Sequence, residues 1–270
     1  NNAATSYPKP QCVLDAHAAA LHGLPAGQFR SAGTAGSEDI LKECREVMGQ
    51  ILGVAETKRI HFTAGATHSV NAVLSGLDLA GAHIITTAIE HNSILRPLYN
   101  RPELRDCRIT VVPCNAFGWV DPALIEAQVK EDTRMVVVNH CSNVTGCIQN
   151  MKAIGEITAR HRLIYFADVS QSAGCLPICG DEWQADILVF TGHKSLLGTA
   201  GTGGYYVRGD PSLKPFMYGG TGRGSQVLVY SEELYEYDPG TQNAPGLTAL
   251  KAGAEYWPPQ GIEQVAWRGE

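Results

Sequence analysis

Polar and ionisable side chains follow five apolar stretches of this sequence, at the point where each stretch ends. They are Gly65-Ala66-Thr67, Glu90-His91-Asn92, the run from Asn139 to Asn143, Asp168 with Gln171, and Thr191-Gly192-His193-Lys194. In an open, mostly parallel sheet, ligands bind beyond the carboxyl ends of the strands, so these groups are expected to share one site. Together they supply an amine, a carboxylate, amides, imidazoles and a helix start.

Pyridoxal phosphate is the small molecule that needs this set of groups. Its aldehyde needs a lysine, for which the sequence offers Lys194, and its pyridine nitrogen needs a carboxylate, for which it offers Asp168. Its phosphate needs a helix N-terminus with hydroxyl groups nearby, as Thr67 provides. The sequence therefore predicts a pyridoxal phosphate site and no metal centre.

Each candidate also has an ordinary structural interpretation. Asp168 has the position of a helix cap, Lys194 alone would be read as a surface lysine, and His91 and His193 could be satisfied polar residues near helix starts. The segment Gly65-Ala66-Thr67 could be a plain turn. Their joint occurrence at strand ends favours a common ligand site over five separate structural roles.

Short β-branched runs alternate with longer helical periods, which is typical of an α/β fold. Ser37 is the expected cap of a helix ending near Gly53, and Pro122 has the first position of another helix. We expect further helices over residues 67–77, after a turn at Ala64-Gly65-Ala66, and over residues 92–99 and 248–257. Strands are expected over residues 59–63, 83–87, 108–112, 135–139, 163–168, 186–191 and 205–207.

Composition narrows the functional classes. The chain has 270 residues, a formal charge of -6 and no basic run, which argues against a nucleic-acid or membrane partner. No apolar stretch approaches membrane-spanning length, and the first residues lack a signal-peptide pattern. The eight cysteines form no Cys-x-x-Cys pair, which favours reduced thiols and a cytoplasmic protein.

Six segments resemble the cysteine desulfurases of the class V aminotransferase family, with the greatest similarity to the NifS-like and SufS-like branch. They are Asn2 to Thr5, Phe62 to Thr67, Glu90 to Ser93, Ser142 to Gly146, Asp168 to Gln171 and Thr191 to Lys194. The resemblance implies the fold type I of pyridoxal phosphate-dependent transferases, with a mostly parallel seven-stranded sheet flanked by helices. Residues 1–257 would form the large cofactor-binding domain, and residues 258–270 would begin a small C-terminal domain that is largely missing.

The resemblance also assigns roles to single residues. Lys194 would hold the cofactor and move the substrate's Cα proton, Asp168 would pair with the pyridine nitrogen, and His91 would stack on the ring. Gln171 and Asn143 would donate hydrogen bonds toward the ring hydroxyl. The phosphate cradle would comprise Ala66, Thr67, Thr191 and His193, with Thr241 completing the phosphate site of a neighbouring subunit in a homodimer. Ala64, His68 and Ser170 depart from common family residues, and none of them removes a cofactor contact.

The expected reaction converts L-cysteine to L-alanine and transfers the sulfur as a persulfide. A sulfur-acceptor protein is an expected partner that receives this sulfur. Family enzymes use a downstream cysteine and a carboxylate-binding arginine, but no cysteine follows Cys179 and neither Arg208, Arg223 nor Arg268 has the family's context. We therefore expect these groups beyond Glu270. The alternatives are another class V reaction, such as selenocysteine or cysteine lysis or amino-group transfer, and an inactive cofactor-binding scaffold. Cys141 and Cys147 flank Asn143, and a structural role is favoured for both.

Overall fold

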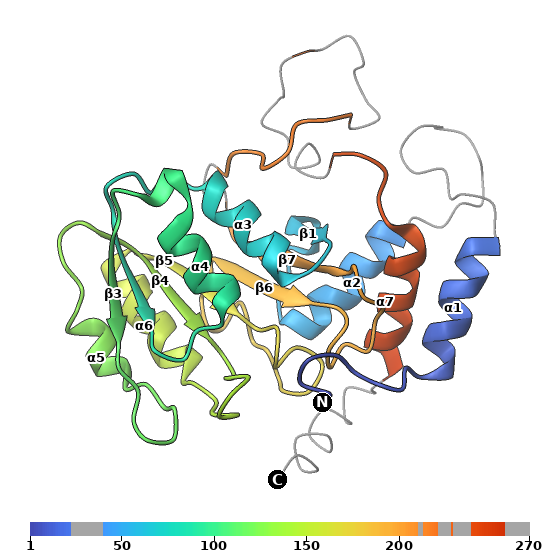
Figure 1. Ribbon diagram of the computed structural model, residues 1–270, viewed down its shortest axis with the longest axis horizontal. Coiled ribbons are helices and arrows are strands. Elements are labelled where there is room, and N and C mark those ends of the chain that lie inside the picture. The colour runs from blue at the N-terminus through green and yellow to red at the C-terminus, as the bar shows by residue number, and fades with distance from the viewer. Residues whose placement is uncertain (23–39, 210–212, 221–227, 229–238, 257–270) are drawn as a thin grey trace.

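In the part of the chain that the structure describes, seven strands form one sheet in the order β1-β7-β6-β5-β4-β2-β3 (Figure 1). The computed structural model describes residues 1–22, 40–209, 213–220, 228 and 239–256. The strands are β1 (Ile60–Thr63), β2 (His83–Thr87), β3 (Arg108–Val112), β4 (Thr133–Asn139), β5 (Ile164–Asp168), β6 (Ile187–Thr191) and β7 (Gly203–Val207). The helices are α1 (Gln11–His22), α2 (Ile40–Leu52), α3 (Ala66–Gly76), α4 (Asn92–Asn100), α5 (Pro122–Glu126), α6 (Met151–His161) and α7 (Ala244–Tyr256). Short 3-10 turns cover Thr57–Arg59 and Pro102–Leu104.

Strand direction determines where the loops meet. Strands β3, β2, β4, β5 and β6 run parallel, whereas β7 runs antiparallel to both β6 and β1. The register of β4 and β5 places Asn139 opposite Asp168 at the carboxyl ends of both strands. The loops that follow the parallel strands therefore open on one edge of the sheet, as the sequence predicts.

Helices cover both faces of the sheet. One buried cluster joins residues of α2, α5, α6 and α7 to one face, and a second joins residues of α3 and α4 to the other. The central strands are buried on both faces, which explains their continuous apolar sequences. Helix α1 lies beside α7 on the outside of this layer (Figure 1). The predicted mostly parallel, seven-stranded α/β architecture is confirmed.

Among the described helices, α1 and α6 were not predicted from the sequence. Helix α1 is alanine-rich and buries only Val13, so its apolar pattern is weak. Helix α6 has a clear pattern through Ile154 and Ile157, and the side chain of Asn150 caps it by accepting a hydrogen bond from the Ala153 N–H. The sequence therefore carries a helix signal over this segment.

The last described helix begins four residues before the predicted start at Thr248. Pro245 and Gly246 suggest a turn, but the Asn243 side chain accepts a 3.1 Å bond from the Gly246 N–H and so caps a helix that includes both residues. Proline is tolerated in a first helical turn because its missing N–H would have had no partner there. The predicted cap Ser37, the end at Trp257 and the domain boundary at 257/258 fall outside the described residues.

No helix in the described part of the chain is both long and apolar enough to cross a membrane.

Candidate active site

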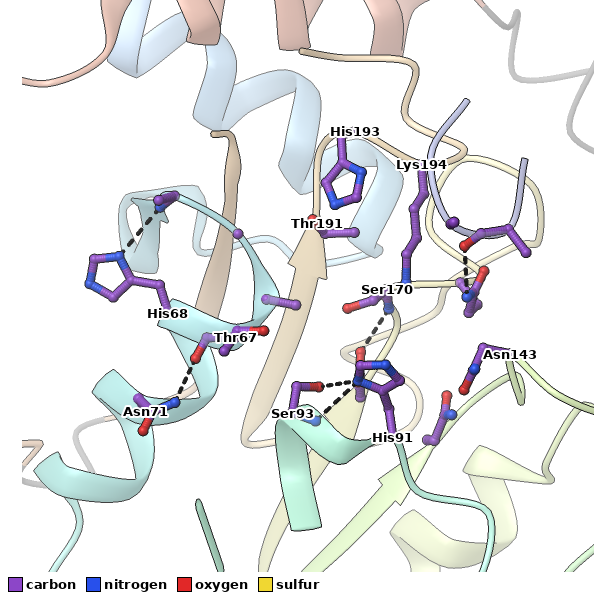
Figure 2. Close-up of a pocket in the computed structure, with 18 of the residues that line it drawn as sticks. Thr67, His68, Asn71, His91, Ser93, Asn143, Ser170, Thr191, His193 and Lys194 are labelled. Carbon is purple, nitrogen blue, oxygen red and sulfur yellow. Dashed lines mark hydrogen bonds between the residues drawn. The ribbon is translucent and has the colours of Figure 1, made fainter. Parts of the chain in front are cut away.

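A cavity of 860 Å³ opens at the carboxyl ends of the parallel strands (Figure 2). Nine of the ten site residues predicted from the sequence line it: Ala66, Thr67, His91, Asn143, Asp168, Gln171, Thr191, His193 and Lys194. They come from the ends of β5 and β6, from the loops after β4, β5 and β6, from the start of α3 and from the residue that caps α4. Residues separated by more than 120 positions in the chain therefore meet around one space.

The tenth predicted residue, Thr241, lies elsewhere. It lines a second cavity of 220 Å³ together with Gln242 and Asn243. The two cavities share Ala64, His68 and Phe216 in their linings. Thr241 therefore lies in a neighbouring cavity and is not part of the lining of the first one.

Lys194 and Asp168 form the electrostatic centre of the large cavity. Asp168 is 3% exposed at the end of β5, and its Oδ1 accepts a 2.8 Å bond from the Ser170 N–H. Burial lowers the pKa of Lys194, and the nearby Asp168 carboxylate opposes that shift. Burial also lowers the pKa of His193, helped by the positive charges of Lys194 and Lys9. A lysine whose charge is disfavoured by burial has a larger neutral fraction available for nucleophilic and proton-accepting chemistry.

His91 is oriented by the helix that it caps. Its Nδ1 lies 3.1 Å from the Ser93 backbone N, which donates to it, and 2.8 Å from the Ser93 hydroxyl (Figure 2). Because Nδ1 acts as the acceptor, the ring proton of neutral His91 is assigned to Nε2. The imidazole is therefore held at the cavity wall in one orientation and one tautomer.

The start of α3 supplies an anion-binding geometry. Gly65 precedes the helix with a φ of 142°, a conformation that favours glycine. The first backbone bond of this turn runs from Ser69 N to Gly65 O, leaving the N–H groups of Ala66, Thr67 and His68 without acceptors among the described residues. These groups and the Thr67 hydroxyl are suited to bind a phosphate.

Glu90 is a buried acid whose role sequence reasoning missed. Its Oε1 accepts bonds from the Thr87 hydroxyl at 2.6 Å and the Asn139 N–H at 2.9 Å, while its Oε2 is buried without a partner in the described structure. Burial raises the pKa of Glu90 to about 8, the two hydrogen bonds oppose the shift and Asp168 adds to it. A glutamate directly after a buried strand and before a helix-capping histidine was the available signal.

The first residues of the chain also line the cavity, which was not predicted. Asn1, Ala3 and Ala4 are at its wall, and the Gln171 amide donates a 3.1 Å bond to the Ala3 carbonyl. Ala3 and Ala4 belong to the first of the six segments that resemble the family, and no role was predicted for them. Their small side chains leave room where the segment passes the cavity.

The described residues provide neither a metal site nor a reactive cysteine at this cavity. Within the described ranges, no group of three or more histidine, cysteine or acidic side chains is placed to hold a metal ion. None of the described residues that line the large cavity is a cysteine, and burial raises the pKa of Cys141 to about 11, with Cys175 and Cys147 adding to that shift. Cys141 is therefore a poor nucleophile in this state.

Comparison with known proteins identifies the family. The family model described as aminotransferase class-V matches residues 1–269. The chain belongs to the class V aminotransferase family. The resemblance found in the six sequence segments is thus confirmed.

Relatives of this class V chain carry a consistent name. It is 34% identical over 239 residues to a probable cysteine desulfurase of Methanothermobacter thermautotrophicus, covering 85% of this chain and 58% of that protein. It is 33% identical over 213 residues to a putative cysteine desulfurase IscS 1 of Bacillus subtilis, covering 77% and 52%. The chain spans about half the length of the curated relatives that it matches.

Solved structures give the same result for the class V fold. The apo structure of a cysteine desulfurase from Thermococcus onnurineus matches with a TM-score of 0.84 and 26% identity, covering 98% of this chain and 67% of that one. A structure described as SspA in complex with cysteine matches with a TM-score of 0.82 and 25% identity, covering 96% and 72%.

Proposed function

We propose that this chain forms the cofactor-binding part of a pyridoxal phosphate-dependent cysteine desulfurase, which converts L-cysteine to L-alanine and transfers the sulfur as a persulfide. The observation that carries the proposal is the convergence of Lys194, Asp168 and the start of α3 on one cavity. Family membership and the names of the relatives support the same reaction.

The groups that line the cavity match the groups that pyridoxal phosphate would need. The free N–H groups at the start of α3, with the Thr67 hydroxyl, would hold the phosphate. The Ser170 hydroxyl lines the cavity, is buried and has no partner in the described segments, so it offers a further polar group to a ligand. Asp168 would pair with the pyridine nitrogen, and Lys194 would attach the cofactor. We further assign ring stacking to His91, ring-hydroxyl bonds to Asn143 and Gln171, and phosphate contacts to Ala66, Thr191 and His193.

When bound, the cofactor supplies an electron sink for the bonds at the substrate's Cα. Lys194 accepts and returns the Cα proton through Nζ, and the low-dielectric cavity keeps this amine neutral more often than in water. Asp168 is shielded from solvent, so its attraction for a protonated ring nitrogen is weakly screened. The Ser93 hydroxyl and N–H fix His91 against the cavity wall.

Sulfur transfer also needs an acceptor thiolate. The described part of the cavity lining holds no cysteine, and Cys141 is disfavoured by its raised pKa, so we assign this step to a thiol outside that lining. The carboxylate-binding arginine is likewise assigned outside it. A sulfur-acceptor protein is the proposed recipient of the persulfide.

The assembly proposal follows from Thr241. This residue lies just outside the large cavity, and we propose that it completes the phosphate site of a second copy in a homodimer. We also propose that residues 1–257 form the large domain, that residues 258–270 begin a second one, and that the protein is cytoplasmic. The eight unpaired cysteines fit a reducing compartment.

Incubation of the whole protein with pyridoxal phosphate, L-cysteine and a reductant tests the reaction. We expect alanine and sulfide in equal amounts, and we expect Lys194→Ala to yield neither. Pyruvate with sulfide would indicate lysis, and a keto acid without sulfide would indicate amino-group transfer. Cofactor binding with no product would indicate a scaffold. Each of these three outcomes would overturn the proposal.

A further inference from the structure

The carbonyl of His193, directly before Lys194, is held by an unusual number of donors. Thr5 Oγ1 and Ser6 Oγ each donate to it at 3.1 Å, the Ser6 N–H at 3.0 Å, and Lys9 Nζ at 3.0 Å. A carbonyl oxygen has two lone pairs, so two donors would satisfy its hydrogen-bonding capacity, and the His193 carbonyl has four. All four come from residues 5–9, more than 180 positions away in the chain.

Lys9 is the exceptional member of this group. Its ammonium also donates a 2.6 Å bond to Ser6 Oγ, and it has no acidic partner in the described portion of the chain. Burial keeps the ammonium of Lys9 partly out of water, which is energetically costly and lowers the pKa of this lysine. Hydrogen bonds from a charged donor are roughly twice as strong as neutral ones, which offsets that cost at the His193 carbonyl.

The segment that carries these donors is anchored at both ends. Before Lys9, the Ala3 carbonyl accepts a bond from Gln171, and Ala3 and Ala4 line the large cavity. After Lys9 comes α1, which buries Val13 and packs along α7 (Figure 1). Residues 1–9, which we term the N-terminal strap, therefore join a packed helix to two parts of the cavity wall.

The backbone after His193 is already constrained. The Lys194 carbonyl accepts a 2.9 Å bond from the Leu197 N–H, and the Gly198 N–H donates to Gly192 at 2.8 Å. Leu197 has a φ of 60°, a conformation that side-chain-bearing residues adopt at a cost. The His193–Lys194 peptide is thus fixed by this turn on one side and by the strap on the other.

We propose that Lys9 is a positioning residue for Lys194: its ammonium, acting with Ser6 and Thr5, clamps the His193 carbonyl and so fixes the backbone from which Lys194 Nζ reaches the cofactor. The inference rests on the proposed attachment of the cofactor to Lys194. It adds that order in the N-terminal strap and order at the attachment point are coupled.

Hydrogen exchange of the cofactor-free protein tests the clamp. In Lys9→Met we expect the amides of Ser6, Leu197 and Gly198 to exchange roughly tenfold faster, because one charge-assisted bond is lost. Lys9→Arg keeps a charged donor and should restore slow exchange. Lys58 is exposed, and Lys58→Met is the matched control, expected to match wild type.

A second readout uses the loaded protein. The rate at which pyridoxal phosphate dissociates should rise roughly tenfold in Lys9→Met and return toward wild type in Lys9→Arg. Unchanged exchange at Leu197 and Gly198 in Lys9→Met would overturn the inference. So would faster exchange spread equally over the strands, which would show general destabilisation.

If Lys9→Met fails to fold, Thr5→Val and Ser6→Ala each remove one side-chain donor from the same carbonyl. Smaller increases confined to the same amides are expected, and their absence would count against the clamp. Because the exchange measurement uses no cofactor, it is independent of the proposed function. Failure to bind pyridoxal phosphate would overturn the proposed function and the cofactor-directed part of the role of Lys9, whereas the exchange result would still decide whether Lys9 clamps the His193 carbonyl.

Discussion

Two aspartates at opposite ends of neighbouring strands have nearly the same local chemistry and different surroundings. Asp168 ends β5 and accepts a 2.8 Å bond from the Ser170 N–H, and Asp186 precedes β6 and accepts a 2.8 Å bond from the Tyr165 N–H. Each has a cation nearby, Lys194 in the first case and Arg208 in the second.

What differs is the space that each carboxylate faces. Asp168 faces the 860 Å³ cavity, where helix starts and strand ends converge, whereas Asp186 faces a 370 Å³ groove at the amino ends of the strands. Burial raises the pKa of Asp186, and its bond from Tyr165 and the charge of Arg208 oppose that shift. An aspartate that accepts a bond from a backbone amide and lies near a cation thus occurs at both ends of the sheet. Only at the carboxyl ends do parallel strands converge, and this convergence makes Asp168 part of a candidate ligand site.

The largest expected effect separates the two aspartates directly. Asp168→Ala should weaken pyridoxal phosphate binding by about 3 kcal/mol or more, roughly 100-fold, because a buried charge partner is removed. Asp186→Ala should leave that affinity unchanged. Titration of both variants with the cofactor, followed by absorbance, measures the difference. Equal losses of affinity would remove the distinction between the two ends of the sheet.

Glu90 gives the carboxyl-end region a pH dependence of stability. With a folded pKa of about 8, Glu90 keeps a proton that the unfolded chain releases near its ordinary value. Stability should therefore fall as the pH rises between these two values, by about 1.4 kcal/mol per pH unit from this residue. Urea unfolding of Glu90→Gln should show a flatter pH profile over that window. A profile as steep as that of wild type would contradict the assignment of Glu90 as a buried neutral acid.

Gly65→Ala tests the geometry at the start of α3. An added Cβ would lie 3.6 Å from Thr191 Oγ1, an ordinary contact, so the cost arises from the backbone conformation. We expect a loss of about 1–3 kcal/mol in unfolding free energy, together with weaker binding of inorganic phosphate. Gly81→Ala also changes a positive-φ glycine, but Gly81 does not line the cavity and has no atoms within 4 Å of the added Cβ, so this variant serves as control. Phosphate binding that weakens equally in both variants would argue against a phosphate site at α3.

The smallest effect is expected at the amino-end region. Asp186→Asn keeps an acceptor for the Tyr165 N–H and removes a carboxylate whose charge is disfavoured by burial. Its unfolding free energy at neutral pH should change by about 1 kcal/mol or less, and turnover of L-cysteine should match wild type. A marked loss of turnover would mean that the groove at the amino ends of the strands contributes to the reaction.

Much of the fold could be predicted because the central strands are continuous apolar runs followed by polar residues. That pattern located β4, β5 and β6 and gathered Asp168, Lys194 and their neighbours at one edge of the sheet. Element boundaries were less accessible where side-chain caps decide them, as Asn243 does for α7. The alanine-rich α1 was missed because its packing against α7 is a tertiary effect.

The site was less completely predictable for a similar reason. Contacts between distant segments, such as those of Ser6 and Lys9 with the His193 carbonyl, leave no periodicity in the sequence. The burial of Glu90 likewise depends on how β4 and the loop after β2 pack together. Sequence reasoning identified the groups that carry chemistry, and the structure added those that hold them in place.

Borohydride reduction of the pyridoxal phosphate-loaded protein, followed by peptide mass mapping, tests the central claim most directly. Our account predicts one pyridoxyl group per chain, carried by Lys194, and none in Lys194→Ala. A pyridoxyl group on another lysine, or no stable attachment at all, would contradict it.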